Sequence, residues 1–176
     1  MARVPYPEVI EDSEIGRLHQ QIRRERSGSV PNLYRMLLNS PTIAAGWLHL
    51  LTAIRQQALL RGRYRELAIL RIAQMNGAPY EFDAHVPFAR REGVTAEEIA
   101  ALSDWPRSAI YTQIDRSVLA YTDAMTRDIH VTDDVFAPLR AGFDDRELVE
   151  LTATIAAYSM VSRFLEALKI DPEQLV

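Results

Sequence analysis

Three ionisable residues in the middle of the chain have the types and spacing needed to move protons. Glu81 and His85 are four residues apart, so on a helix their side chains share one side and can touch. A carboxylate beside an imidazole holds the ring in one tautomer and raises its basicity, which suits a general acid or base near neutral pH. A local Glu–His contact at the protein surface, without a catalytic role, is the simpler interpretation of this spacing.

Glu66 completes the set. At helical spacing it shares a face with apolar residues of the segment 67–73, which predicts that its carboxylate points inward. Burying such a group without a partner costs on the order of 1–3 kcal/mol or more. An ion pair to Arg71 or Arg163 would satisfy it structurally, and a shared acid–base site would use it chemically.

Other catalytic arrangements find less support. The chain has no cysteine, which excludes a disulfide scaffold, a thiolate nucleophile, a cysteine-ligated zinc ion and an iron–sulfur cluster. It carries no Gly-x-Ser-x-Gly elbow, phosphate loop or dinucleotide fingerprint. Two glutamates and a histidine could bind a metal, but di-iron bundles repeat Glu-x-x-His, whereas Glu81 and His85 have a longer spacing that occurs once. We therefore expect no metal and no cofactor, with a metal-assisted lyase or hydrolase as the competing hypothesis.

The composition is that of an ordinary globular protein. The 176 residues are 48% hydrophobic and 25% charged, with a net charge of −4, so nothing in the bulk favours a nucleic-acid partner. The N-terminus lacks the apolar core of a signal peptide, and no segment approaches the roughly 18 apolar residues of a membrane span. We expect a cytoplasmic protein with no membrane partner.

The apolar residues recur at helical spacing throughout, and no strand pattern is found. Helices are predicted, in chain order, over 11–26, shortly after Pro31, over 41–60, 63–76 and 79–91, after Thr95, over 113–128 and 133–141, and from Asp144 onward. The 41–60 helix is expected to bury Ile43, Trp47, Leu50, Leu51 and Ile54 and to end in a left-handed cap at Gly62. Pro87 interrupts the 79–91 helix next to His85, either as a packing device or as an opening for a ligand.

Three linked stretches resemble the core of the carboxymuconolactone decarboxylase family, whose superfamily includes alkylhydroperoxidase D. They are RELAILR (65–71), NGAPYEFDAHVP (76–87) and GVTAEEI (93–99), and the run 148–158 resembles the closing helix of the family. The peroxidase branch has a glutamate at the position of Glu66, a histidine at that of His85, and a Cys-x-x-Cys pair where this chain has Ala78 and Glu81. Without thiolates, thiol peroxidase activity is excluded. The Tyr-Glu-x-x-x-His pattern is instead usual in the decarboxylase-like branch.

The resemblance implies an all-α, alkylhydroperoxidase D-like fold built around a central helical hairpin. We expect a single domain over 1–176, with an N-terminal extension (1–40), a core carrying the motif (41–105) and C-terminal helices (106–176). It also implies a homo-oligomer, a trimer or hexamer and possibly a dimer, with the site near a subunit interface.

The activity implied is that of a cofactor-free lyase in aromatic compound breakdown, releasing CO₂ from a small unsaturated lactone or carboxylic acid. His85 would donate or accept the proton, Glu81 would orient it, and Glu66 would be a second buried acid or orienter. The expected substrate-binding residues are Arg71, Tyr80, Tyr158 and Arg163. An isomerase or tautomerase of a similar acid and a catalytically silent oligomeric binding protein are the alternatives.

Overall fold

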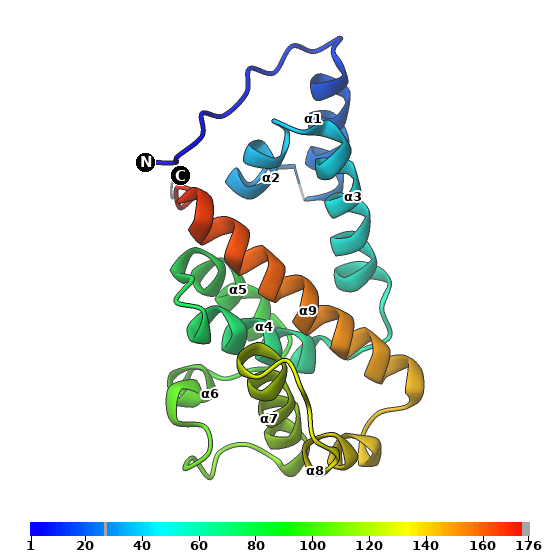
Figure 1. Ribbon diagram of the computed structural model, residues 1–176, viewed down its shortest axis with the longest axis vertical. Coiled ribbons are helices and arrows are strands. Elements are labelled where there is room, and N and C mark those ends of the chain that lie inside the picture. The colour runs from blue at the N-terminus through cyan, green and yellow to red at the C-terminus, as the bar shows by residue number, and fades with distance from the viewer. Residues whose placement is uncertain (27, 174–176) are drawn as a thin grey trace. The chain divides into compact units, whose positions relative to one another are not determined.

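The structure is a computed structural model that describes residues 1–26 and 28–173. The helices, labelled in Figure 1, are α1 (Glu14–Glu25), α2 (Asn32–Leu37), α3 (Pro41–Thr52), the π-helix η1 (Ala53–Gln57), α4 (Gly62–Met75), α5 (Pro79–Arg91), α6 (Ala96–Ala101), the 3₁₀-helix η2 (Leu102–Asp104), α7 (Gln113–Arg127), α8 (Asp133–Phe136), the 3₁₀-helix η3 (Ala137–Ala141) and α9 (Asp145–Leu168). The all-α prediction is confirmed, because helices are the only regular structure in the part of the chain described.

The chain forms two compact units. One comprises residues 1–57 together with the chain from 165 onward, and the other is Ala58–Phe164. The second unit contains the resemblance stretches and all three candidate residues. The single-domain organisation expected from the sequence, with divisions after residues 40 and 105, stays a prediction.

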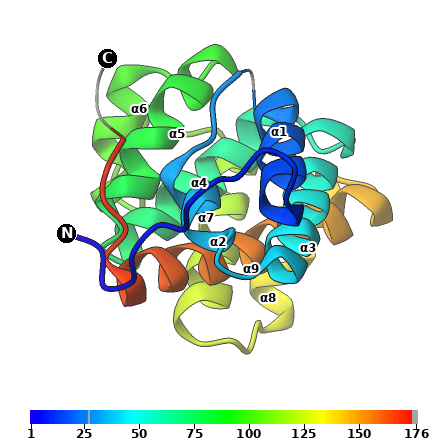
Figure 2. The ribbon, with the colours of Figure 1, turned by 90° about the horizontal axis from the view of Figure 1, so that it is seen from above.

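Helix α4 is the central helix of the second unit. It packs against α5 and α7, and Figures 1 and 2 both show α4 and α5 side by side. Its run from Glu66 to Leu70 is buried without interruption, as expected for a helix that is apolar on most sides. The burial of Glu66 in this run means that its carboxylate must find partners inside the unit.

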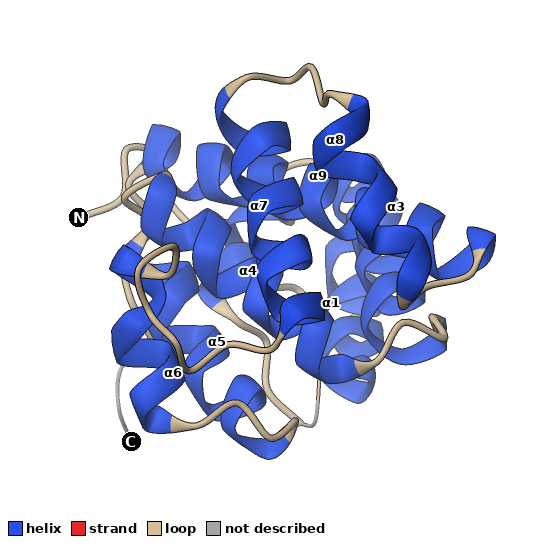
Figure 3. Ribbon diagram, turned by 90° about the horizontal axis from the view of Figure 1, so that it is seen from below, coloured by secondary structure: helices blue, strands red, loops and turns tan. Residues whose placement is uncertain are grey.

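Local signals explain where the helices of this unit begin and end. Gly77 has φ +62° and terminates α4, and Pro79 opens α5 two residues later. The side chain of Thr95 accepts from the Glu98 amide in a complete capping box at the start of α6, which confirms the predicted start signal. Short connections of this kind produce the predominantly helical trace in Figure 3.

Predictions for the 41–60 helix were partly wrong. Its α-helical part ends at Thr52 and continues as η1, and its buried stripe includes Ala44, Leu48 and Leu51. Ile43 and Leu50 precede stripe positions by one residue, so they face outward and are 50% and 42% exposed.

Gly62 does not close that helix in a left-handed cap. It is the first residue of α4, and the glycines with positive φ are Gly28, Gly77 and Gly93. The π-helical turn and the short stretch 58–61 separate Gly62 from the preceding helix, so no cap is needed there.

Helix α9 is long and apolar enough to cross a membrane by length and composition alone, and 56% of its qualifying window is buried inside the structure. A core helix passes the same test, so this observation is weak support for a membrane span. The cytoplasmic location and the lack of a membrane partner stay predictions.

Candidate functional site

The hairpin of α4 and α5 brings the three predicted residues together. Glu66 lies on α4, while Glu81 and His85 lie one turn apart on α5. The Nδ1 atom of His85 is 2.7 Å from Glu66 Oε2, and its Nε2 atom is 3.2 Å from Glu81 Oε1. The imidazole ring is therefore held between two carboxylates from consecutive helices.

This triad, defined as Glu66, His85 and Glu81, is almost completely shielded from solvent. The residues are 1%, 4% and 4% exposed in the order given. The Tyr158 ring of α9 meets the His85 ring edge-on at 5.1 Å, and the Phe88 ring lies 5.5 Å away on α5. Aromatic walls around a charged ring exclude water and strengthen the electrostatic contacts inside.

The environment favours a charged pair. Burial alone would lower the pKa of His85, but its hydrogen bonds to Glu66 and Glu81 outweigh this and raise the pKa above its usual 6.5. Burial would raise the pKa of Glu66, yet the His85 hydrogen bond and the nearby positive charges hold it below 4.5. The two carboxylates therefore favour the protonated, imidazolium form of His85.

Arg65 is the arginine that pairs with Glu66, and the spacing of charges in the sequence did not predict it. Its Nε donates to Glu66 Oε1 at 3.0 Å. Adjacent residues of a helix do not normally face each other, so pattern reasoning pointed instead to Arg71 or Arg163. That prediction was wrong because the Arg65 guanidinium reaches the carboxylate of the adjacent residue, while Arg71 and Arg163 have other partners. The cluster of arginines at 61, 63 and 65 is the sequence feature that could have indicated a cation beside Glu66.

Arg71 belongs to a different network. It binds Asp123 of α7 through Nε at 2.6 Å and Nη2 at 2.8 Å, and its Nη1 donates to Gln74 and to the Leu102 carbonyl. The Trp105 indole also donates to Asp123. The structure therefore places the Arg71 guanidinium against α7 and η2 rather than on the triad.

The other expected substrate-binding residues divide in the same way. Tyr158 packs on His85, and half-buried Tyr80 precedes Glu81 in the first turn of α5. Arg163 is exposed on α9 and donates to the Ser159 carbonyl of its own helix. The structure thus places Tyr158 against the triad, while Tyr80 is next to Glu81 along the chain, and the binding roles of all four residues stay predictions.

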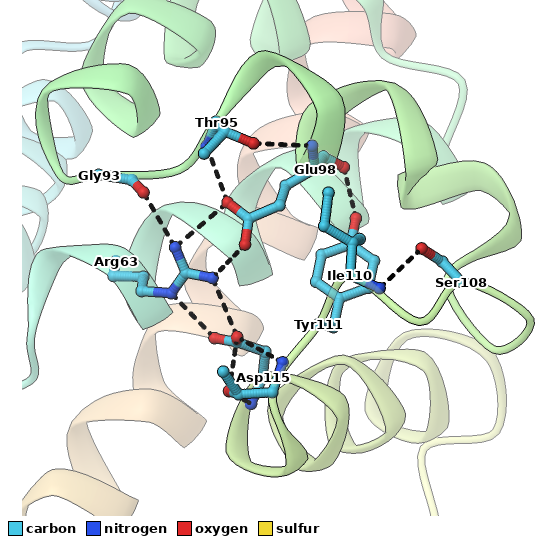
Figure 4. A network of polar contacts seen from close by, with 9 residues as sticks. Arg63, Gly93, Thr95, Glu98, Ser108, Ile110, Tyr111 and Asp115 are labelled. Carbon is cyan, nitrogen blue, oxygen red and sulfur yellow. Dashed lines mark hydrogen bonds and ion pairs between the residues drawn. The ribbon is translucent and has the colours of Figure 1, made fainter.

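A second polar network fixes the start of α4. Arg63 donates to Glu98 Oε1 at 2.6 Å and forms a two-point contact with Asp115, as Figure 4 shows. Glu98 and Asp115 are the last residues of the capping boxes that open α6 and α7. One arginine therefore ties the start of the Glu66 helix to two neighbouring helix starts.

The described residues contain no group of three or more side chains arranged to hold a metal ion. In the triad both nitrogens of His85 already have carboxylate partners, which is the arrangement of a hydrogen-bonded relay. The expectations of no metal and no cofactor stay predictions.

The fold and the site define an all-helical protein with a buried Glu–His–Glu triad and no cysteine. Residues 41–124 match the model of the Carboxymuconolactone decarboxylase family. The uncharacterised protein YnjA of Escherichia coli (strain K12) is 29% identical over 150 residues, which cover 84% of this chain and 77% of YnjA.

Among solved structures, a protein of unknown function from Agrobacterium tumefaciens, suggested to be an antioxidant defence protein AhpD, is 28% identical. Its TM-score is 0.73, with 79% of this chain and 96% of that chain covered. The debrominase Bmp8, solved in complex with 2,3,4-tribromopyrrole, has a TM-score of 0.80 at 19% identity over 98% of this chain and 94% of its own, and it shows the fold alone. The chain is thus similar to the carboxymuconolactone decarboxylase family over residues 41–124, and its fold is similar to that of the AhpD-like protein from Agrobacterium tumefaciens.

Proposed function

We propose that this protein is a cofactor-free lyase that removes CO₂ from a small unsaturated lactone or carboxylic acid by acid–base chemistry. The observation that carries the proposal is the His85 ring held between Glu66 and Glu81 at 2.7 and 3.2 Å in a nearly dry site. The similarity to the carboxymuconolactone decarboxylase family supports the class of chemistry, and the absence of cysteine argues against a thiol peroxidase.

The reaction needs one proton and no external electron acceptor. The bond between the substrate carbon and its carboxylate breaks, and CO₂ leaves. The electron pair delocalises into the unsaturated system as a dienolate. The His85 imidazolium then protonates that carbon, and solvent returns the proton to His85.

The two contacts of His85 assign different roles to the two glutamates. The shorter contact, to Glu66, keeps the Nδ1 proton in place and orients the ring, as the carboxylate of a serine-protease triad does. The longer contact, to Glu81, is the weaker one, so the substrate would displace this carboxylate and receive the Nε2 proton. Tyr158 and Phe88 would wall off water during the transfer.

Substrate anchoring is assigned first to the tyrosines. Tyr80 and Tyr158 lie on the segments that hold or contact the triad, and each could offer a hydroxyl to a lactone oxygen. Arg71 would have to release Asp123 to bind a substrate carboxylate, and Arg163 would have to turn away from its own helix.

The test is a panel of unsaturated lactones and carboxymuconate-like acids, followed by CO₂ release and ultraviolet absorbance. For any compound of the panel that the protein converts, His85→Gln should reduce kcat at least about 100-fold. The matched control is His130→Gln, an exposed histidine outside the triad, which should leave kcat unchanged. An unchanged rate in His85→Gln would remove His85 from the mechanism. Absorbance changes without CO₂ would replace the lyase with an isomerase or tautomerase.

The near-complete burial of the triad also supports a catalytically silent protein in which these contacts only stabilise the fold. That alternative predicts no turnover across the panel and a change in stability alone when His85 is replaced. The expected assembly into a trimer, hexamer or dimer is a separate proposal, which light scattering on the purified protein would test.

A further inference from the structure

The two oxygens of the Glu66 carboxylate bind two different cationic side chains, Arg65 and His85. The Arg65 Nε occupies Oε1 at 3.0 Å, while Oε2 accepts from His85 Nδ1 at 2.7 Å. Because each oxygen has its own donor, the carboxylate cannot turn both oxygens toward the imidazole without breaking the contact with Arg65. The Arg65 side chain is only 12% exposed, so water competes little for this contact.

Glu92 holds the other end of the Arg65 guanidinium. Its Oε1 lies 3.5 Å from Arg65 Nη2, and it sits at the C-terminal end of α5. The Glu92 carboxylate lies over Gly62, where a methyl group would overlap it. Gly62 is also the first residue of α4, whose positive end favours a nearby anion. The glycine thus leaves the space in which Glu92 reaches Arg65.

These contacts form a row of side chains with alternating charge. From the surface inward the row is Glu92, Arg65, Glu66, His85 and Glu81. The remaining described rings that contact His85 are the uncharged side chains of Tyr158 on α9 and Phe88 on α5. A change at the outer end of the row should therefore reach His85 through Glu66.

We propose that Arg65, seated by Glu92, is a positioning residue that reserves one oxygen of Glu66 and leaves His85 a single bond to that carboxylate. Its catalytic meaning rests on the proposed function. An imidazolium bound by one carboxylate oxygen releases its proton to a substrate more readily than one bound by both.

The experiment follows the ring nitrogens of His85 by NMR across a pH titration of the folded full-length protein. In Arg65→Gln both Glu66 oxygens are free for the imidazole, and the apparent pKa of His85 should rise by about one unit. Arg65→Lys keeps the charge, so the apparent pKa of His85 in this variant should lie between the values of wild type and Arg65→Gln. In Glu92→Gln, Glu66 is the only carboxylate left in contact with Arg65. The positive charge of Arg65 is then less compensated, so the pKa of His85 should fall by a few tenths of a unit.

Gly62→Ala tests the contact between Glu92 and Arg65 without changing any charge. Its methyl group displaces only the flexible end of Glu92, so the fold should survive and the shift should follow Glu92→Gln in direction. Arg90→Gln, at an exposed arginine of α5, is the matched control and should leave the titration of His85 unchanged.

Opposite shifts for Arg65→Gln and Glu92→Gln support the positioning role. Shifts of the same sign, or an Arg65→Gln shift no larger than that of Arg90→Gln, would overturn it. If Arg65→Gln does not fold, Arg65→Lys and Glu92→Gln decide the question, and a wild-type titration in both overturns the proposal.

The titration uses no substrate, so its outcome is independent of whether any candidate acid is turned over. If a substrate is found, Arg65→Gln should lower kcat about tenfold with little change in KM, and the basic limb of the kcat profile should move upward with His85.

Discussion

Replacing Glu66 with glutamine tests whether ion pairs to His85 and Arg65 stabilise the buried Glu66 side chain. The substitution conserves volume but removes the carboxylate that accepts from His85 at 2.7 Å and from Arg65 at 3.0 Å. A glutamine offers one acceptor oxygen and one NH₂ donor. Whichever way the amide is turned, one of the two cationic donors therefore meets another donor in a site that is 1% exposed.

The expected cost follows from breaking a buried ion pair. Removal of one partner costs about 3–5 kcal/mol, and the acceptor that glutamine keeps returns about 1 kcal/mol. The free energy of unfolding should thus fall by about 2–4 kcal/mol in Glu66→Gln. In a double-mutant cycle with His85→Gln, the coupling energy should be about 1.5–3 kcal/mol, as for a hydrogen bond between charged groups.

The effect should depend on pH in a defined way. Burial would lower the pKa of His85, but the carboxylates raise it above 6.5, so its contribution is full below 6.5 and is lost as pH rises through the folded value. Burial would raise the pKa of Glu66, but His85 and Arg65 lower it below 4.5, so its contribution is present above 4.5 and is lost as pH falls through the folded value. The difference between wild type and Glu66→Gln should therefore be largest between 4.5 and 6.5.

Urea unfolding followed by circular dichroism, repeated across the pH range, measures this difference. Glu166→Gln, at an exposed glutamate of α9, is the control and should change stability little. A loss below about 0.5 kcal/mol within the window, or a loss of equal size at every pH, would refute the ion-paired description of the triad.

Three further predictions concern the elements around the triad. Arg63→Leu leaves the buried carboxylates of Glu98 and Asp115 without their cation and should cost about 3–5 kcal/mol in urea unfolding, whereas Arg61→Leu on the exposed N-cap should change little. Gly77→Ala places a side chain at φ +62° with no steric contact, so thermal unfolding should show a loss of about 1 kcal/mol from the backbone alone. With a substrate in hand, kcat should fall on the basic side as the raised pKa of His85 is crossed, and a profile falling below 6.5 instead would contradict its role as the acid.

The α4–α5 hairpin shows how much of this protein follows from local sequence. Gly77 and Pro79 mark the end of one helix and the start of the next, and the spacing of Glu81 and His85 predicts their contact. These features depend on backbone hydrogen bonds and helical periodicity within a few residues, so they can be inferred without knowing the tertiary structure. The lack of cysteine likewise excludes thiol chemistry on composition alone.

Only the tertiary structure decided which distant charges meet. Glu66 pairs with Arg65 and His85, while Arg71 pairs with Asp123, 52 residues away. A one-residue offset likewise determines which apolar side chains of α3 are buried, so Leu50 is exposed and Leu51 is not. The sequence alone determined helices and a plausible acid–base set, because both arise from short-range geometry. Partner choice and burial depend on how helices pack, and no local spacing encodes that packing.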